Sequence, residues 1–417
     1  MKEKKLVLVP RRRFAEFSNG WKLNKLDDLG QFGKTYAYSR AKEGNGEYHH
    51  IHYGDIHVKY NGFITENTLI PSLSVQGDFE VLKENDIVIA DASEDYFDLG
   101  KTAIVQAIDN KKIIAGLHTF KITPNENLNS KFYLYYSQTN LFKNFSYKTG
   151  TGISVFGISK ANIRKMQLNI PKQKEQQIIG DFFKQLDQMI TLEQRKLEKT
   201  KALKSAYLAD MFPAEGERVP KRRFAGFTGE WKERRLEDLA EVRTGKAFSS
   251  LDFNDEGEYL VITNKNVQDQ ENDVTLVGDR IDIKDESIIN DYLLNGINVL
   301  VTMDGVNIGK TGKFKHEKAV LAQRVGRLNS DQVEFIYQIT KMNKFILEMK
   351  RLSVGNAIKH ISLKQIAEYS FFAPVLKEEQ RAIGEFFKKL DDSITNQQQK
   401  LDKLKAMKQA YLQEMFV

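Results

Sequence analysis

Residues 175–212 read EQQIIGDFFKQLDQMITLEQRKLEKTKALKSAYLADMF, and residues 379–416 read EQRAIGEFFKKLDDSITNQQQKLDKLKAMKQAYLQEMF. More than half of the paired positions are identical, so the second stretch repeats the first. In both copies apolar residues recur every three or four positions and no proline interrupts them, which predicts two helices. Each helix would be about 57 Å long, at about 1.5 Å per residue.

The apolar stripes of the two predicted helices have the same length and phase, which favours packing of one helix on the other. Glu193 and Gln397 interrupt the stripes, and polar residues at such positions often fix the register of a coiled coil. The alternative is a long helix on the surface of a globular body. The residues expected in the helix contact are Ile179, Phe183, Leu186, Ile190 and Leu197 in the first copy, and Ile383, Phe387, Leu390, Ile394 and Leu401 in the second.

A shorter repeat precedes each long one. Residues 9–29 read VPRRRFAEFSNGWKLNKLDDL and residues 219–239 read VPKRRFAGFTGEWKERRLEDL, with both tryptophans of the chain, Trp21 and Trp231, at matching places. Between the repeats lie two stretches that match each other only in fragments. The predicted order is a frame segment at 1–21, an insert at 22–171, a long helix at 172–212, a linker with the repeated frame segment at 213–231, a second insert at 232–374 and a second long helix at 375–417.

The two inserts are predicted to be mixed α/β domains. Strand-like runs such as 86–90, 259–262 and 297–301 alternate with loops rich in glycine, asparagine and aspartate. Each insert also contains a helix-like run, at 131–145 and at 332–352. The fold class is therefore α/β, with two related domains separated by long helices.

Charge and composition limit the classes of function. The net charge of +7 and the pI near 9.0 favour a polyanionic partner, because lysine and arginine displace counterions from phosphates. The absence of cysteine excludes disulfides, thiolate nucleophiles and zinc fingers. No apolar run is long enough for a signal peptide or a membrane span, so a cytoplasmic protein is expected.

No sequence motif indicates catalysis. Gly-Lys-Thr occurs at 100–102 and 309–311, but a phosphate-binding loop needs glycine where Asp95 and Asp304 stand. No two prolines are adjacent and no aspartate follows a proline, so the usual signatures of amino-group DNA methyltransferases and of many nucleases are missing. We predict that the chain has no catalytic residue of its own.

One segment is rich in possible metal ligands. Residues 49–57 read HHIHYGDIH. Histidine is a common metal ligand, but strand-like alternation would place these rings on two faces, and the second insert has apolar residues near the matching place. We predict surface imidazoles and no metal site.

Basic triplets stand at equivalent points of the two short repeats. They are Arg11, Arg12 and Arg13 in the first, and Lys221, Arg222 and Arg223 in the second. Such runs are ordinarily solvated charge. Their recurrence favours a contact with phosphate or with an acidic partner.

The arrangement resembles the specificity subunits of type I restriction–modification systems over essentially the whole chain. The resemblance rests on two entry segments of the form Phe-x-x-Phe-x-x-x-Trp, at 14–21 and 224–231. It rests also on the proline-led openings of the long helices, at 171–187 and 374–391. It implies that each insert is a target recognition domain for half of a bipartite DNA site, and that the helices form an antiparallel coiled coil.

The resemblance also implies partners and cofactors. Two modification subunits would dock on the helices, bring S-adenosylmethionine and methylate adenine N6, and restriction subunits would add ATP- and Mg-dependent translocation and cleavage. This chain would bind double-stranded DNA and no cofactor. Antiparallel packing of duplicated helices would also bring the start and the end of the chain together.

Within the inserts, loop residues are expected to contact base edges while lysine and arginine contact phosphate. The candidates are Tyr53, Lys101, Lys148 and Thr151 in the first insert, and Asn264, Lys265, Lys310 and Asn356 in the second. A stand-alone bivalent DNA-binding regulator is the main alternative function, and a structural coiled-coil adaptor is a third.

Overall fold

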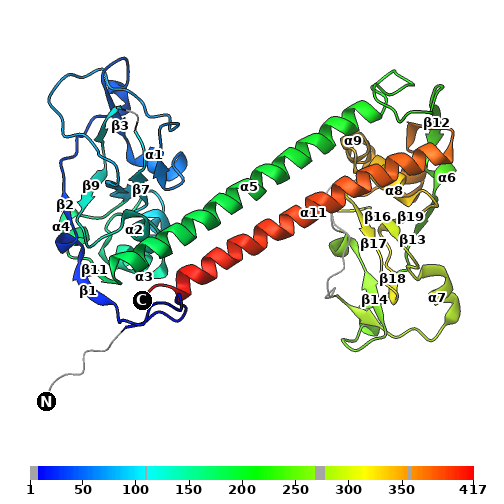
Figure 1. The fold of residues 1–417 in the computed structure, drawn as a ribbon. Coiled ribbons are helices and arrows are strands. Elements are labelled where there is room, and N and C mark those ends of the chain that lie inside the picture. Colours follow the sequence, from blue (N-terminus) through cyan, green and yellow to red (C-terminus); the bar gives the residue numbers. More distant parts are fainter. Residues whose placement is uncertain (1–7, 109, 268–277, 356–358) are drawn as a thin grey trace. The chain divides into compact units, whose positions relative to one another are not determined.

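The computed structural model describes residues 8–108, 110–267, 278–355 and 359–417. The chain divides into two compact units, the first formed by the chain up to Gln194 with Lys400–Val417, and the second by Arg195–Gln399. Each unit holds one insert, one short repeat and one end of each long helix, as the colours of Figure 1 show. The predicted α/β fold class with two related domains is confirmed.

The long helices are α5 (Gln173–Met211) and α11 (Lys377–Glu414). In the first unit Asp187 accepts an ion pair from Lys408 at 2.6 Å and Glu193 accepts one from Lys400 at 2.9 Å, so the helices run antiparallel there. In the second unit the other ends of the same helices meet with the pair Lys204–Asp391 at 2.6 Å. Desolvation lowers the pKa of Lys204, and the Asp391 carboxylate opposes that shift.

The predicted apolar stripe packs on more than the opposite helix. Ile179, Phe183 and Leu186 belong to the core of the first insert, where the ring of Phe183 stacks on Tyr135. The buried members of the stripe are Ile179, Phe183, Leu186, Leu197, Ile383, Phe387 and Leu401, whereas Ile190, Leu390 and Ile394 are half-buried.

The first insert is built on a five-stranded sheet of order β2-β9-β5-β7-β4, with β3 and β8 paired in parallel beside it. Strands β1 and β11 close the insert next to α5. Its elements are β1 (Lys22–Lys25), η1 (Leu26–Asp28), β2 (Gly30–Phe32), η2 (Arg40–Lys42), β3 (Tyr48–Ile51), α1 (Tyr53–Val58), β4 (Phe63–Ile64), β5 (Ile87–Ala90), β6 (Ala92–Ser93), η3 (Tyr96–Asp98), β7 (Thr102–Val105), β8 (Lys112–Ala115), β9 (Thr119–Pro124), α2 (Ser130–Tyr136), α3 (Asn140–Thr149), β10 (Phe156–Gly157), α4 (Lys160–Arg164) and β11 (Gln167–Ile170).

The second insert repeats this plan with a four-stranded sheet, β13-β19-β16-β17, and a parallel pair, β14 and β18. Strands β12 and β20 close it as β1 and β11 close the first. Its elements are β12 (Lys232–Arg235), α6 (Leu236–Leu239), β13 (Glu241–Thr244), η4 (Ser250–Asp252), β14 (Tyr259–Ile262), η5 (Asn264–Asn266), β15 (Arg280–Ile281), α7 (Glu286–Tyr292), β16 (Asn298–Thr302), β17 (Thr311–Phe314), β18 (Ala319–Leu321), β19 (Val325–Asn329), α8 (Val333–Lys341), α9 (Asn343–Leu352), α10 (Leu363–Ala367) and β20 (Ser370–Ala373).

In each insert, the run predicted to be one continuous helix forms two helices. The prediction of a continuous run was therefore wrong. In the first insert the Thr139 side chain accepts a hydrogen bond from the Phe142 amide and caps a new helix, α3. In the second insert Met342 adopts an extended conformation between α8 and α9. Apolar periodicity continues through both breaks, which is why the sequence did not reveal them.

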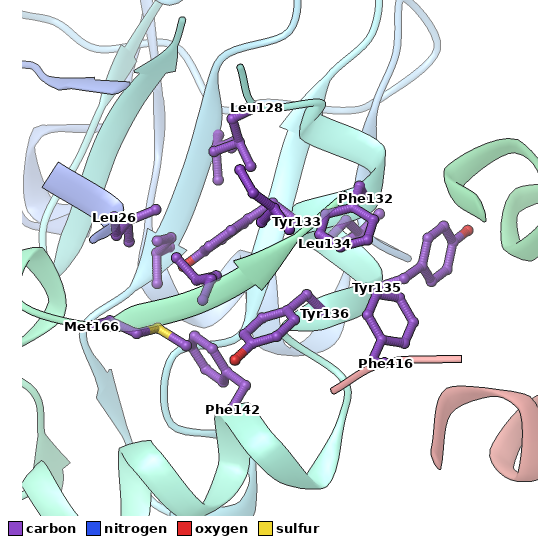
Figure 2. Close-up of a cluster of buried hydrophobic side chains, with 14 of the residues drawn as sticks. Leu26, Leu128, Phe132, Tyr133, Leu134, Tyr135, Tyr136, Phe142, Met166 and Phe416 are labelled. Carbon is purple, nitrogen blue, oxygen red and sulfur yellow. The ribbon is translucent and has the colours of Figure 1, made fainter. Parts of the chain in front are cut away.

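The C-terminal end of the chain lies in the core of the first unit. Phe416 packs edge-on against Trp21, with ring centroids 6.3 Å apart, and contacts Phe132 and Tyr136 as well. Figure 2 shows its ring beside the aromatic residues of α2. The Arg12 amide donates to the Glu414 carbonyl at 3.0 Å. The predicted proximity of the chain's start and end is therefore confirmed for the described residues, from Leu8 onward.

The middle of the chain makes the same contacts in the second unit. Phe212 packs edge-on against Trp231 at 5.8 Å and stacks on Phe335. The Arg222 amide donates to the Asp210 carbonyl at 2.8 Å. In each unit, a phenylalanine just beyond the C-terminal end of a long helix therefore packs on the tryptophan of a short repeat.

Candidate nucleic-acid interface

Loops gather at one end of the sheet in the first insert, and we call residues 52–57, 91–101, 117–118 and 150–157 its loop edge. His57 joins them, because its Nε2 atom hydrogen-bonds to the Ala92 carbonyl at 2.9 Å and its own carbonyl accepts from Lys101 Nζ at 3.0 Å. Gly157 pairs with Ala92 and exchanges backbone hydrogen bonds with Thr151. Four separate chain segments therefore form one continuous surface.

The second insert has a corresponding loop edge, formed by residues 263–267, 303–310, 323–324, 354–355 and 359–360. Asp304 joins these segments. It accepts a hydrogen bond from Asn264 and an ion pair from Arg324 Nε at 3.8 Å, and it bridges to His360 in the backbone. The same loops therefore meet at the same end of the sheet.

Backbone hydrogen bonds give residue-by-residue equivalence between the two loop edges. Lys101 and Lys310 are equivalent, because their carbonyls accept from the strand-end amides of Ala90 (2.8 Å) and Thr302 (2.9 Å).

Tyr53 and Asn264 are equivalent in the same way. Each stands two residues after a strand-end isoleucine, Ile51 or Ile262, whose carbonyl accepts from the neighbouring parallel segment at 3.0 and 2.9 Å. Two pairs of residues proposed from the sequence thus occupy matching places.

In the first insert, the four DNA-contact candidates lie on or beside the loop edge. Tyr53 is half-buried, with its ring 4.6 Å from His52 and 5.4 Å from His118. Lys148 is exposed near the end of α3, and Thr151 is exposed in the loop that follows. Their contact with DNA stays a prediction.

In the second insert, three candidates lie on the loop edge. Asn264 is half-buried against Asp304, Lys265 is exposed, and Lys310 is half-buried in the turn that enters β17. Asn356 lies outside the described residues.

Some residues of the loop edges were not predicted. His118 and Arg324 occupy equivalent turns and are described in detail below. Phe97 and Val306 are also equivalent, because the carbonyl of the next residue in each loop accepts from the Lys101 or Lys310 amide. Both are exposed large apolar side chains, at 74% and 93%. The sequence offered no signal for them, since isolated apolar residues are common on protein surfaces.

The histidine-rich segment is held by contacts within the chain. The chain turns from β3 into α1 within it, and His52 caps α1 by accepting from the Gly54 amide. His49 hydrogen-bonds to the Ile70 carbonyl, and His50 lies 3.3 Å from a Glu43 carboxylate oxygen. Across the described residues, no group of three or more histidine, cysteine, aspartate or glutamate side chains could hold a metal ion.

Two carboxylates, one half-buried and one buried, lie at the first loop edge. Burial raises the pKa of Asp91, and the hydrogen bond from His118 opposes that shift. Burial would also raise the pKa of Asp55, but hydrogen bonds from Lys59 and Arg40 lower it below its ordinary value. Asp55, in α1, is therefore ionised, and its charge is compensated within the chain.

The basic triplets divide into exposed and buried members. The Arg13 guanidinium makes two hydrogen bonds of 2.7 Å to Glu175, and that of Arg223 makes bonds of 2.6 and 2.7 Å to Glu379. All four side chains are largely buried. These bidentate pairs account for Arg13 and Arg223 within the chain, so we do not retain them as phosphate contacts.

The other four members of the triplets are exposed. Arg12 pairs with Glu414, and Arg222 lies 3.7 Å from Asp210. Arg11 and Lys221 are exposed on the same segments. A phosphate or partner contact for these four residues stays a prediction.

The family model for the type I restriction modification DNA specificity domain matches residues 18–202 and 228–406. The chain is similar in fold to the S subunit of a type I restriction-modification system from M. genitalium, at 14% identity, a TM-score of 0.65, and coverage of 98% of this chain and 99% of that one. A crystal structure of the HsdS subunit from Thermoanaerobacter tengcongensis matches at 16% identity and a TM-score of 0.43, covering 95% and 96% of the two chains.

A further structural match, at 16% identity and a TM-score of 0.49, comes from a study of complex assembly and conformational transition of the type I R-M system, and covers 97% of this chain and 99% of that one. In the part of the chain that the structure describes, no helix is long and apolar enough to cross a membrane. The family model covers most of the chain in two copies that coincide with the two inserts and their helices. The chain therefore belongs to the family of type I restriction–modification DNA specificity subunits.

Proposed function

We propose that each insert reads one half of a bipartite double-stranded DNA target through its loop edge. The observation that carries this proposal is the contrast between equivalent positions. The two inserts share the order of four strands in the main sheet and the backbone hydrogen bonds at the loop edge, yet Tyr53 in one stands where Asn264 stands in the other. A hydrogen-bonding amide and a phenol ring suit different base edges. Two surfaces that share a backbone arrangement but carry different side chains are suited to the recognition of two different half-sites.

The long helices set the distance between the half-sites and dock two modification subunits. Two half-sites on one face of B-DNA lie about one helical turn, roughly 34 Å, apart, and helices about 57 Å long can span that distance. Exposed apolar side chains on α5 support docking, since Met189 and Leu192 lie in the first unit and Leu203 in the second.

Specificity subunits of this family carry no catalytic centre of their own. In our proposal the modification subunits bring S-adenosylmethionine and transfer its methyl group to adenine N6. Restriction subunits add ATP- and Mg-dependent translocation and cleavage. This chain contributes recognition and geometry, and the assembly acts on DNA in the cytoplasm.

Replacing residues 22–171 with a second copy of residues 232–374 tests the proposal. The junctions match in register, because Lys22 pairs with Ile170 as Lys232 pairs with Ala373. The complex of this chimaera with the modification subunits is expected to methylate sites that contain the second half-site twice and lack the first. The reciprocal chimaera, with residues 22–171 in both places, should show the reverse. Mapping of methylated adenines gives the result, and unchanged sites in either chimaera would overturn the proposal.

A further inference from the structure

The turns that enter β9 and β19 carry equivalent residues, His118 and Arg324. The amide of Asp91 donates to the His118 carbonyl at 3.0 Å, and the amide of Met303 donates to the Arg324 carbonyl at 3.1 Å. Both donors directly follow the central strand of the sheet, next to the register pairs Ala90↔Thr119 and Thr302↔Val325. The two residues therefore occupy one position of the shared fold.

Both residues hold a left-handed backbone conformation, with φ of 54° at His118 and 69° at Arg324. Glycine adopts this region without cost, whereas a β-carbon disfavours it. Asparagine, aspartate and histidine are enriched among the exceptions, and arginine is not. An arginine kept at such a position in one insert, and a histidine at the same position in the other, point to a use for the side chain itself.

Both side chains project from the loop edge into solvent. That of His118 is 52% exposed and that of Arg324 is 56% exposed. Each lies beside one carboxylate: His118 Nδ1 hydrogen-bonds to Asp91 at 3.0 Å, and Arg324 Nε forms an ion pair with Asp304 at 3.8 Å. In the described part of the chain, neither Nε2 of His118 nor the two terminal nitrogens of Arg324 hydrogen-bond to another side chain. These nitrogens are hydrogen-bonding groups exposed at the surface.

His118 and Arg324 each lie beside a residue already placed on the loop edge. The Tyr53 ring lies 5.4 Å from the His118 ring, and Asn264 shares the Asp304 carboxylate with Arg324. The two loop edges thus present different pairs of side chains on the same backbone, an imidazole with a phenol ring and a guanidinium with an amide.

We propose that Arg324 and His118 are specificity-determining residues, and that Arg324 recognises a guanine in the second half-site. A guanidinium fork can donate two parallel hydrogen bonds to O6 and N7 of guanine in the major groove. With Nδ1–H donating to Asp91, the His118 imidazole accepts one hydrogen bond at Nε2 from the exocyclic amino group of a base in the first half-site. This inference rests on the proposed function and names the residues that carry it.

Arg324→Gly and His118→Gly test the inference. Glycine removes the side chain and relieves the backbone conformation, so neither variant should unfold, and the melting temperature checks this. Methylation by the complex with its modification subunits is measured on duplexes in which each base pair of both half-sites is varied. Arg324→Gly is expected to lose about 10- to 100-fold of its preference for guanine at one base pair of the second half-site. Preference in the first half-site should be retained.

His118→Gly should give the mirror result, confined to the first half-site. Arg324→Lys keeps the charge but not the fork, so it should lose most of the same preference. Arg235→Ala is the matched control, because Arg235 is 55% exposed and pairs with one carboxylate, Glu237 at 3.3 Å, but lies on β12 outside the loop edge. It should leave all base preferences unchanged.

Competition binding of the same duplexes gives the base preference of any variant whose methylation is too slow to measure. Arg324→Gly with the unaltered guanine preference would overturn the inference while the proposed function stands. A complex of the unaltered chain that shows no bipartite preference would instead overturn the proposed function.

Discussion

The two halves of this chain agree in their frame, by which we mean the short repeats and the long helices, and differ at their loop edges. In the frame, Arg12 lies over the Tyr411 ring at 5.0 Å and Arg222 lies over the Tyr207 ring at 5.2 Å. At the loop edges, an imidazole in one half corresponds to a guanidinium in the other. The duplicated halves have kept the contacts that hold each unit together and have changed the side chains that face outward. Packing therefore tolerates little change, whereas the exposed edge accepts new chemistry.

The buried ion pairs of the frame offer the strongest test of that agreement. Arg13→Met and Arg223→Met each leave a buried carboxylate without its guanidinium, which is expected to cost about 3–5 kcal/mol of unfolding free energy. Arg223→Met should cost about 1 kcal/mol more, because Glu175 keeps a hydrogen bond from the Trp21 indole at 3.3 Å and the Trp231 indole makes none in the described residues.

Denaturant unfolding of the purified variants measures these costs. Replacing both partners, as in Arg223→Met with Glu379→Gln, should recover most of the loss, since no buried charge then remains. Equal costs for Arg13→Met and Arg223→Met would mean that the indole contact is not stabilising and that the two frames are energetically equivalent.

The loop-edge lysines give a smaller expected difference. Lys101 is held by the Asp98 carboxylate at 3.4 Å, but the equivalent position in the second insert is Asn307, which is neutral. Lys310→Ala should therefore weaken DNA binding by the complex more than Lys101→Ala, roughly 5-fold or about 1 kcal/mol. Loss of a phosphate contact lowers affinity for all sequences alike and reduces the salt dependence by about one counterion.

Dissociation constants measured over a series of salt concentrations test this difference. Asp98→Asn is the matched control, because it removes the carboxylate and leaves Lys101 with its hydrogen bond to the His57 carbonyl, so the two lysines should then differ less. An unaltered salt slope for Lys310→Ala would show that this ammonium group does not contact phosphate.

Much of the frame could be predicted from the sequence because its segments occur as two similar copies in the chain. The helix bounds follow from apolar spacing, and the proximity of Phe416 to Trp21 follows from the order of the repeats. The partners of the basic triplets could not be predicted, because Arg13 and Glu175 are far apart in the chain. A run of arginines has the same appearance whether it faces solvent or a buried carboxylate.

The loop edges were harder to predict than the frame. The distance in sequence between equivalent residues falls from 211 for Tyr53 and Asn264 to 206 for His118 and Arg324, since loop lengths differ between the inserts. Only backbone hydrogen bonds restore the alignment. A positive φ at a residue other than glycine leaves no trace in composition or periodicity, so His118 and Arg324 were not among the candidates.

The smallest expected difference lies inside the two sheets, at the equivalent cations Lys121 and Arg327. The first donates to Glu80 at 2.7 Å, and the second donates to the neutral Asn298 side chain at 2.7 Å. The hydrogen bond from Lys121 lowers the pKa of Glu80 below its ordinary value of 4.5. Its stabilising contribution is therefore present above pH 4.5 and is lost as the pH falls through the lower folded-state pKa.

Glu80→Gln should destabilise the first unit near pH 7 by less than about 1 kcal/mol, because Glu80 is partly exposed and solvent screens the pair. The difference from the unaltered chain should shrink as the pH falls below 4.5, because the Glu80 carboxylate is protonated first in the unfolded chain and, below the lower folded-state pKa, in the folded chain as well. The cost of Arg327→Gln should depend less on pH between 3.5 and 7, since the hydrogen-bond acceptors of Arg327, the Asn298 amide and the Leu293 carbonyl, do not titrate there and only the Coulombic attraction of Glu241 does. Unfolding free energies measured across this range separate the two cases. A pH-independent effect of Glu80→Gln would mean that Lys121 is held by Asp86 and the Val81 carbonyl alone, and that the two sheets bury their cations in the same way.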